Sequence, residues 1–347
     1  MSVATNKPRL SFYNYDKLYS YNGIYNFLCG ARGLGKTYGA KLKAINAAIE
    51  KGHQFVYLRR YKDELKKTKD SFFADIEAEG AFPDWDFRVE GYFAQMAPAK
   101  TRDEKKRGWK TIGYFIPLST SQSVKGVSYP LVRTIIFDEF IIEKGMVRYI
   151  PDEATVFTNF YSTVDRYKST TRVFFLANAV SIMNPYFLEY DIKPDEVGEF
   201  HQARDGFIVC HFADSKDFQN DVYQTRFGKF IKDTAYADYA VGSEFSDNHD
   251  GLIGSKTIDA VYVYTMESKK GTFSVWVDYS NNTYYIQSKR PKNERIYTLM
   301  ADQLREGKVL MVYGDRLMQD MRTAFRHGRA IFDAPQARNA FVEIFKR

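Results

Sequence analysis

The sequence predicts an α/β fold, in which a mostly parallel sheet carries helices and is followed by a smaller α+β domain. Three observations support this prediction. The chain has 347 residues, which is enough for about two domains of ordinary size. Up to about residue 200, short apolar runs alternate with helix-like stretches, a pattern typical of parallel sheets. Beyond that point, short strands with alternating apolar residues follow one another more closely.

The elements of the first domain follow from apolar runs and from the residues that bound them. Gly52 ends the first long helix, Pro83 follows the second, and Pro151 introduces the third. Residues 87–117 are less regular and suggest a hairpin around a charged stretch. Strands are expected at residues 24–29, 54–59, 131–137 and 172–177, and residues 207–212 are a candidate for the same sheet. Helices are expected at residues 36–50, 61–79 and 152–167.

The C-terminal part has a different pattern. Residues 225–239 look helical, and the Gly-, Ser- and Asp-containing stretch 242–254 looks like a loop. Asn281 and Asn282 suit the turn of a hairpin. Strands are expected at residues 260–265, 272–279 and 283–289, and helical stretches at residues 301–306 and 315–326. These elements fit a small α+β domain.

Composition limits the class of protein. The chain is 44% hydrophobic and 27% charged, as is usual for soluble globular proteins. Its aromatic content is high, at 16%, and strand-rich core packing explains this more simply than exposed rings stacking on bases. The net charge of +7 and the pI of about 9 suit a polyanionic partner. Many basic proteins bind no nucleic acid, so the charge alone does not identify one.

The cysteines and the hydropathy pattern indicate the compartment. Cys29 and Cys210 are far apart in the sequence, so we expect neither a disulfide framework nor a zinc cluster. This use of cysteine favours a reducing, cytosolic setting. No stretch is apolar for long enough to cross a membrane. The first 20 residues lack the apolar core of a signal peptide.

The strongest motif is G-x-x-x-x-G-K-[ST], placed between an expected strand and an expected helix. Its glycines permit a tight turn whose N–H groups face phosphates, and the helix N-terminus adds positive charge. Lys36 would reach the β- and γ-phosphates, and the Thr37 hydroxyl would ligate Mg²⁺. The alternative is a glycine-rich turn with a chance Lys-Thr pair. The predicted nucleotide site consists of Gly30, Ala31, Arg32, Gly33, Leu34, Gly35, Lys36 and Thr37.

Two acids end the apolar run at residues 134–137. The position places Asp138 and Glu139 at the carboxyl end of a buried strand, where ligands bind in open α/β sheets. Asp138 would hold Mg²⁺, and Glu139 would activate the attacking water as general base. Neither D-x-x-G nor N-K-x-D occurs here, which favours an ATPase over a GTPase. The alternative is a strand end with two solvated acids.

Asn178 ends the next buried strand. It would sense the γ-phosphate by binding the attacking water or Glu139, although a cap on the strand-to-loop turn is an alternative role. Ring ATPases often supply an arginine in trans to the γ-phosphoryl group. Arg166, at the end of the helix before this strand, is the leading candidate, and Arg32 would touch phosphate, neighbouring acids or solvent. The competing basic residues are Arg59, Arg60, Lys62, Arg148 and Arg172.

Basic residues in two segments are candidates for contact with DNA. Lys125 lies in the loop 119–126. The other segment also contains Asp103 and Glu104, so a solvated hairpin tip is an equally good interpretation. Its basic residues, which surround Trp109, are Lys100, Arg102, Lys105, Lys106, Arg107 and Lys110.

The acids of the second domain do not have the spacing of a two-metal nuclease. Asp247 and Asp250 lie in the expected loop, far in sequence from Asp278. Asp278 most simply precedes the hairpin turn.

With these residues identified, the chain resembles the genome-packaging ATPases of phi-29-like bacteriophages. The similarity is more specific than a P-loop and extends from about residue 15 to the C-terminus. It is carried by Gly30 to Lys36, by Gln54 to Lys62, by Phe137 to Ile141, by Asn184-Pro185-Tyr186-Phe187 and by Thr225-Arg226-Phe227-Gly228.

The resemblance implies three regions. Residues 1–205 would be an ASCE-type P-loop ATPase domain and residues 206–242 a linker. Residues 243–347 would be an RNase H-like domain that binds nucleic acid and has lost its nuclease acids. The arginine of the family that acts in trans falls on Arg166. The basic hairpin differs from the family in length and charge.

The resemblance also implies an assembly. The chain would form a homopentameric ring on the prohead, beside the portal and a structural RNA, and would use ATP and Mg²⁺ to move double-stranded viral DNA inward. It would work in the host cytoplasm, transiently attached to the prohead. Two other functions stay open: another ATP-driven nucleic-acid translocase or helicase, and a non-motor ATP-binding assembly factor. Glu139, which follows Asp138, argues against the second.

Overall fold

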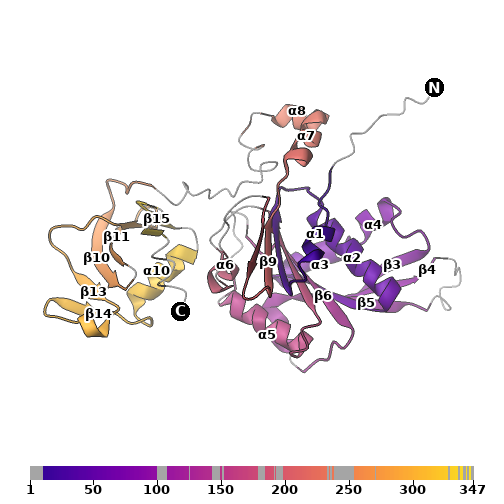
Figure 1. Ribbon diagram of the computed structural model, residues 1–347, viewed down its shortest axis with the longest axis horizontal. Coiled ribbons are helices and arrows are strands. Elements are labelled where there is room, and N and C mark those ends of the chain that lie inside the picture. Colours follow the sequence, from indigo (N-terminus) through magenta and orange to yellow (C-terminus); the bar gives the residue numbers. More distant parts are fainter. Residues whose placement is uncertain are drawn as a thin grey trace. The chain divides into compact units, whose positions relative to one another are not determined.

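The computed structural model describes most of the chain in two compact units, Met1–Val180 with Pro194–Glu244 and Ser181–Lys193 with Phe245–Arg347 (Figure 1). Among the residues singled out above, 100–107, Lys125, Arg148, Pro151, Asp247 and Asp250 lie outside the described part. The described residues are 11–99, 108–124, 126–142, 149–150, 152–178, 184–190, 192, 198–232, 234, 237, 254–269, 271–326, 329–334, 337–338, 341 and 344.

The first unit is built, within the described residues, on a nine-stranded sheet in the order β3-β4-β5-β2-β6-β7-β1-β9-β8. The six strands from β5 to β9 in this order run parallel, which confirms the predicted parallel sheet. Antiparallel hairpins extend both edges. The strands are β1 Tyr25–Gly30, β2 Gln54–Arg59, β3 Trp85–Glu90, β4 Phe93–Pro98, β5 Lys110–Pro117, β6 Val132–Asp138, β7 Arg172–Asn178, β8 Phe200–Ala203 and β9 Ile208–Phe212.

Helices lie on both faces of this sheet (Figure 1). Residues of α1 to α4 share one core cluster with strand residues such as Phe55 and Phe174. On the other face, Phe157 of α5 packs against Tyr25 and stacks on Phe137, which confirms that much of the aromatic content fills the core. The helices of the unit are α1 Asp16–Ser20, α2 Lys36–Lys51, α3 Lys62–Lys69, α4 Ala74–Ala78, η2 Leu118–Val124, α5 Glu153–Asp165, α7 Lys216–Gln224 and α8 Arg226–Ile231.

Two helices predicted from the sequence differ from the helices that the structure describes. The stretch 61–79 forms two helices, α3 and α4, because Phe72 and Phe73 between them are buried in the core. Lys41 Nζ also donates a hydrogen bond to the Phe72 carbonyl oxygen at 2.8 Å. Within the stretch 225–239, the structure describes the helix α8, which Thr225 caps by accepting from the Gly228 N–H at 2.9 Å. The preceding helix α7 was not expected.

The predicted end of the ATPase domain lies within the first sheet. The expected strand at residues 207–212 is β9, which pairs with β1. Residue 205, where the ATPase domain was expected to end, falls in the turn between β8 and β9. The functional division at residues 206–242 stays a prediction.

The second unit contains, in its described part, a six-stranded sheet in the order β14-β13-β10-β11-β12-β15. The three expected strands form its centre, and three strands of three residues each were missed. Met318, Met321 and Phe325 of α10 pack on Phe273 and Val275 of the sheet. The elements are α6 Pro185–Tyr190, β10 Val261–Ser268, β11 Gly271–Asp278, β12 Thr283–Gln287, β13 Ile296–Thr298, η3 Ala301–Gln303, β14 Lys308–Leu310, α10 Arg316–Arg326 and β15 Ala330–Phe332.

Asp278 has the structural role that the sequence predicts. Its carboxylate accepts the N–H groups of Ser280 and Asn281 at 3.0 and 3.1 Å, and so closes the hairpin turn between β11 and β12. Across the described residues, no helix is long and apolar enough to span a bilayer.

Candidate nucleotide site

The glycine-rich loop connects β1 to α2 as the motif requires. Gly33 and Gly35 have φ values of 83° and 81°, in the left-handed region that favours glycine. Leu34 and Ala31 are buried beneath the loop, and Arg32 is exposed above it. The helix therefore begins at Lys36 with its first N–H groups directed at the space above the loop.

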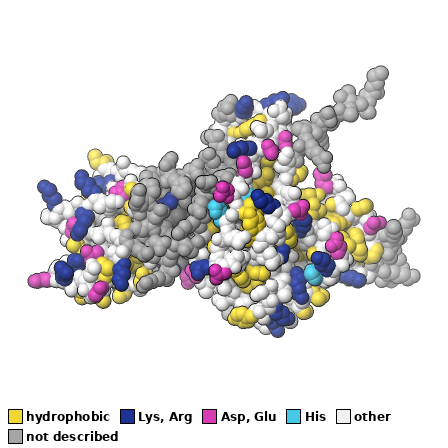
Figure 2. Space-filling model, viewed as in Figure 1, with side chains coloured by type: hydrophobic (Ala, Val, Ile, Leu, Met, Phe, Trp, Pro, Cys, Tyr) yellow, Lys and Arg dark blue, Asp and Glu magenta, His cyan; other side chains and the backbone are white. Residues whose placement is uncertain are grey.

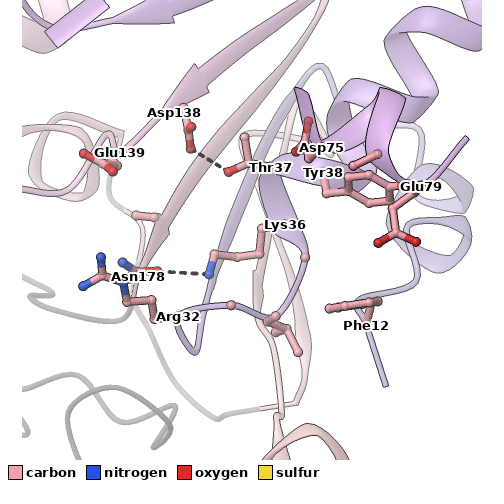
Figure 3. A pocket seen from close by; sticks show the side chains of 15 residues that line it. Phe12, Arg32, Lys36, Thr37, Tyr38, Asp75, Glu79, Asp138, Glu139 and Asn178 are labelled. Carbon is pink, nitrogen blue, oxygen red and sulfur yellow. Dashed lines mark hydrogen bonds between the residues drawn. The ribbon is translucent and has the colours of Figure 1, made fainter. Parts of the chain in front are cut away.

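Lys36 is 6% exposed and lies at the wall of this space. Its Nζ donates to the carbonyl oxygens of Gly30 and Ala31 at 3.1 and 2.7 Å, and to Asn178 Oδ1 at 3.2 Å (Figure 3). These three acceptors carry no net charge. The arrangement holds a buried cation at the place where the motif predicts phosphate.

Thr37 and Asp138 meet as predicted. Thr37 Oγ1 donates to Asp138 Oδ1 at 2.9 Å (Figure 3). Tyr57 OH donates to Asp138 Oδ2 at 2.7 Å. Burial, followed by the charge of Asp138, raises the pKa of Tyr57, so its phenol stays a donor at neutral pH. A hydroxyl and a carboxylate beside a phosphate-binding loop are the oxygen ligands that Mg²⁺ prefers, so these residues fit the metal.

Glu139 follows on the same strand end and is held by Arg59 of β2. Arg59 Nη2 donates to Glu139 Oε2 at 2.5 Å, and Nη1 lies 3.5 Å from Asp138 Oδ2. Burial alone would lower the pKa of Arg59, but Tyr57 and the two carboxylates raise it overall. The guanidinium is therefore a permanent cation between the two acids.

A second arginine fixes the backbone at this point. Arg60 is 2% exposed and pairs with the buried Glu153 of α5, with Nε 2.7 Å from Oε2. It also donates to the carbonyl oxygens of Glu139 and Phe140 at 3.2 and 2.6 Å. Glu139 has a φ of 57°, an unfavourable value for a residue with a side chain. The Arg60–Glu153 pair thus anchors the turn that presents Glu139.

The glycine-rich loop and the two acids Asp138 and Glu139 line one cavity of about 870 Å³. This volume is within the usual range for ligand pockets. In Figure 3, Phe12, Tyr38 and Glu79 lie on one side of Lys36, and Arg32 and Asn178 lie on the other. The cavity is open to a ligand of nucleotide size. Its lining comprises Phe12, Arg32, Gly33, Leu34, Gly35, Lys36, Thr37, Tyr38, Asp75, Ala78, Glu79, Asp138, Glu139, Ala177 and Asn178.

The candidates for an arginine acting in trans differ in exposure. Arg166 is exposed and lies outside the cavity, at the carboxyl end of α5. Arg59 and Arg60 are buried in their own subunit and are unsuited to reach another copy. The guanidinium of Arg172 lies 5.5 Å from the ring centre of Tyr19.

Known proteins that are similar to this chain include phage DNA packaging proteins. The family described as "Podovirus DNA encapsidation protein (Gp16)" matches residues 8–347. The chain is 37% identical to the DNA packaging protein of Bacillus phage phi29 over 339 residues, 97% of each chain. It is also 37% identical to the DNA packaging protein of Bacillus phage B103, over 94% of this chain and 98% of that one.

The chain belongs to the podovirus DNA encapsidation protein family.

Two solved structures resemble this family member. A chain of the bacteriophage phi29 viral genome packaging motor assembly is 35% identical, with a TM-score of 0.60, over 97% of this chain and 99% of that chain. The N-terminal domain of the DNA packaging ATPase from bacteriophage phi29 is 42% identical, with a TM-score of 0.52, over 60% of this chain and 98% of that domain.

In this encapsidation protein, most of the predicted site residues lie at the cavity, whereas Gly30, Ala31 and Arg166 are not among the residues that line it. Lys36, Thr37, Asp138, Glu139 and Asn178 line the same cavity. The sequence predicted that Asn178 forms a hydrogen bond with the attacking water or with Glu139. In the structure, Asn178 Oδ1 accepts a hydrogen bond from Lys36. The position of Asn178 beside the phosphate-binding lysine still suits a sensor of bound nucleotide.

Sequence reasoning missed Phe12 and Tyr57, and it named Arg59 only as a candidate for the arginine acting in trans, not as the partner of Glu139. The β2 residues could have been found from register, because Tyr57 lies beside Ile136 in the parallel pair of β2 and β6. Side chains alternate along a strand, so Tyr57, Arg59 and Asp138 share one face. Phe12 carries no comparable signal, since it precedes the first strand and its neighbours are fixed only by the fold.

The face of the encapsidation protein seen in Figure 2 does not identify a DNA contact. Lys and Arg side chains are spread over the described part of this face and are mixed with Asp and Glu. Within the expected basic segment, Trp109 is described, and its ring centre lies 4.3 Å from the Arg88 guanidinium. A DNA-gripping role for this segment stays a prediction.

Proposed function

We propose that this chain is the ATP-hydrolysing subunit of a ring that moves double-stranded DNA into a phage prohead. The single observation that carries the proposal is the cavity in which Lys36, Thr37, Asp138 and Glu139 converge. The family and the names of the relatives supply the substrate: they are DNA packaging proteins, and one similar chain comes from a viral genome packaging motor assembly.

ATP binding uses the groups that the structure presents to the cavity. The N–H groups of the loop and the ammonium of Lys36 bind the phosphates. Thr37 and Asp138 would hold Mg²⁺, which would offset the negative charge that develops during transfer.

Hydrolysis needs a base, and Glu139 provides it. Arg59 donates a hydrogen bond to Oε2 of Glu139, so Oε1 is the oxygen that accepts the proton from water. The water oxygen then attacks the γ-phosphorus, the bond to the β-phosphate oxygen breaks, and ADP leaves. Asn178, linked to Lys36, reports whether the γ-phosphate is present.

Arg166 completes the site of a neighbouring copy. It precedes β7, whose other end carries Asn178 at the cavity. A strand rises about 3.3 Å per residue, so the seven residues of β7 separate its two ends by about 20 Å. Arg166 is therefore too far from the cavity of its own subunit and suits a head-to-tail contact, which closes into a ring.

The remaining features of the proposal come from the family resemblance. Residues 1–205 form an ASCE-type ATPase domain, residues 206–242 a linker, and residues 243–347 an RNase H-like domain without nuclease activity. Asp278 agrees with that loss, because its carboxylate is used in a turn. The ring is a homopentamer that contacts the portal and a structural RNA, in the host cytoplasm and transiently attached to the prohead.

The test is ATP turnover by the full-length chain, with and without double-stranded DNA and proheads. Turnover should rise when both are present. Subunits with Arg166→Ala and subunits with Lys36→Ala should each be inactive alone and recover activity when mixed, because one supplies the site and the other the arginine. Unwinding of a forked duplex without proheads, or turnover that DNA leaves unchanged, would contradict the proposal.

A further inference from the structure

The turn that carries Arg166 has an unusual backbone. Arg166, Tyr167 and Ser169 have φ values of 52°, 59° and 54°, and none of them is glycine. Residues with side chains are disfavoured in this region. Such a run persists only where the surroundings hold it in place.

A single buried carboxylate holds this turn. Asp165 is 3% exposed. Its Oδ2 accepts the N–H of Ser169 at 2.7 Å, and its Oδ1 accepts the N–H groups of Thr170 and Thr171, both at 2.9 Å. Three backbone donors on one carboxylate close the loop on the end of α5.

The far end of the turn is tied to the sheet. The Thr171 hydroxyl donates to the Val132 carbonyl at 3.1 Å, and its own carbonyl accepts from Tyr161 OH at 3.2 Å. Burial alone would raise the pKa of Asp165, but the N–H groups of Thr171, Ser169 and Thr170 outweigh burial and lower it. The carboxylate is therefore ionised at neutral pH, the form that accepts all three bonds.

The side chains at the tip point outward. Arg166, Tyr167 and Lys168 are exposed, and Tyr167 reaches 92%. A long, exposed arginine normally loses conformational freedom when it binds. A backbone fixed in advance lowers this cost and sets the direction in which the guanidinium extends.

We propose that Asp165 is a positioning residue, whose carboxylate shapes the turn 165–171 so that Arg166 reaches the nucleotide on an adjacent copy of this chain. The inference rests on the proposed action of Arg166 in trans. Asp165 itself touches no nucleotide. It acts through the backbone that it holds.

The first experiment compares Asp165→Asn with the parent chain in DNA-stimulated ATP turnover. The amide keeps the size of the carboxylate, but its NH₂ faces an N–H donor. The value of kcat should fall by about tenfold or more, and KM for ATP should stay within about twofold, because the subunit's own cavity is unchanged. Asp205→Ala is the matched control, since Asp205 lies in the turn between β8 and β9 with a φ of 55°, and should leave both constants unchanged.

The second experiment assigns the defect to a subunit. Asp165→Asn subunits mixed with Lys36→Ala subunits should recover turnover, because each Lys36→Ala copy has an intact arginine for its neighbour. Nucleotide binding by Asp165→Asn alone should equal that of the parent chain, which excludes general unfolding. If Asp165→Asn does not fold, Asp165→Ser, which is smaller and keeps one acceptor, takes its place.

The outcomes separate the inference from the function on which it rests. Failure of the Arg166→Ala mixture to recover would remove the trans mechanism itself. Recovery of that mixture, together with parental turnover by Asp165→Asn, would overturn only the role of Asp165. A rise in KM without a fall in kcat would also overturn it, since the defect would then lie in the subunit's own cavity.

Discussion

Arg59 and Glu139 are joined by a hydrogen bond of 2.5 Å from Nη2 to Oε2, and the two partners differ greatly in exposure. The Arg59 side chain is 7% exposed, and that of Glu139 is 57%. Arg59 also lies 3.8 Å from Glu64, so it is fixed by acids on more than one side. Arg59 is thus the buried partner with several acidic neighbours, and Glu139 is the partner that solvent reaches.

Replacement of Glu139 by glutamine should separate binding from chemistry. The amide oxygen can still accept from Arg59, but it cannot take a proton from water, so turnover should fall by about 10²- to 10⁴-fold. ATP binding should remain near the parental value. Because Glu139 is more than half exposed, the free energy of unfolding should change by less than about 1 kcal/mol. Single-turnover hydrolysis and a nucleotide-binding titration measure the two effects.

The control for this variant is Glu77→Gln, an exposed acid on α4, which should hydrolyse ATP like the parent chain. Near-parental turnover by Glu139→Gln would remove Glu139 from the mechanism.

Breaking the buried pair of Arg60 and Glu153 should destabilise the first unit strongly. Arg60→Met leaves a carboxylate that is completely buried, and the loss should be about 3–5 kcal/mol. The double variant Arg60→Met/Glu153→Leu should be more stable than Arg60→Met alone, because no uncompensated charge remains. Urea unfolding of the three proteins gives the comparison.

An exposed pair provides the reference. Lys43→Met, which removes the ion pair of Lys43 with Asp16, should unfold like the parent chain. A double variant as unstable as the sum of its single changes would show that the charges of Arg60 and Glu153 are not coupled.

His211 should make the stability of the first unit depend on pH. Burial lowers the pKa of His211 from 6.5 to about 4, and the ring stacks on Phe200 with Nδ1 2.8 Å from Tyr13 OH. The folded protein favours the neutral ring, so this contribution is complete above pH 6.5 and is lost as the pH falls toward 4. Between pH 7 and pH 5 the loss should be about 2 kcal/mol.

The variant His211→Gln isolates this term. The difference in unfolding free energy between the parent chain and His211→Gln should shrink from pH 7 to pH 5. A difference that does not change with pH would mean that folding leaves the pKa of His211 unchanged.

Gly228 should tolerate no side chain. A Cβ at this position would lie 1.8 Å from the Val222 carbonyl oxygen and 2.9 Å from Tyr223 Cα, so α7 and α8 would have to separate. Gly228→Ala should destabilise this helix pair by at least about 2 kcal/mol. We expect proteases to cleave Gly228→Ala faster than the parent chain at residues 216–232.

Gly314→Ala is the matched change, because a Cβ there would meet nothing within 4 Å. Its pattern of cleavage should equal that of the parent chain. Equal cleavage of Gly228→Ala would show that the helices can shift at little cost.

The local parts of the site could be predicted from the sequence. The loop from Gly30 to Thr37 and the tandem acids Asp138 and Glu139 are contiguous motifs, each at the end of an apolar run, and the structure brings them together. The parallel sheet then follows from the order of strands and helices. No knowledge of distant partners is needed for these inferences.

The role of each arginine could not be predicted, because burial depends on partners far along the chain. Arg59 and Arg60 are adjacent in sequence, yet the first pairs with Glu139 and the second with Glu153, about 80 and 93 residues away. The strands β13, β14 and β15 were missed for another reason. Three residues are too few to show an alternating pattern, and pairing with longer neighbours defines them.

The two ends of β7 have a consequence for assembly. If Arg166 serves a neighbouring copy, an open row of subunits always begins with an arginine that has no partner and finishes with a cavity that lacks one. Every row, whatever its length, is one functional centre short of its number of members. Only a closed ring has as many functional centres as subunits, so ring closure would itself raise the rate of ATP hydrolysis per subunit.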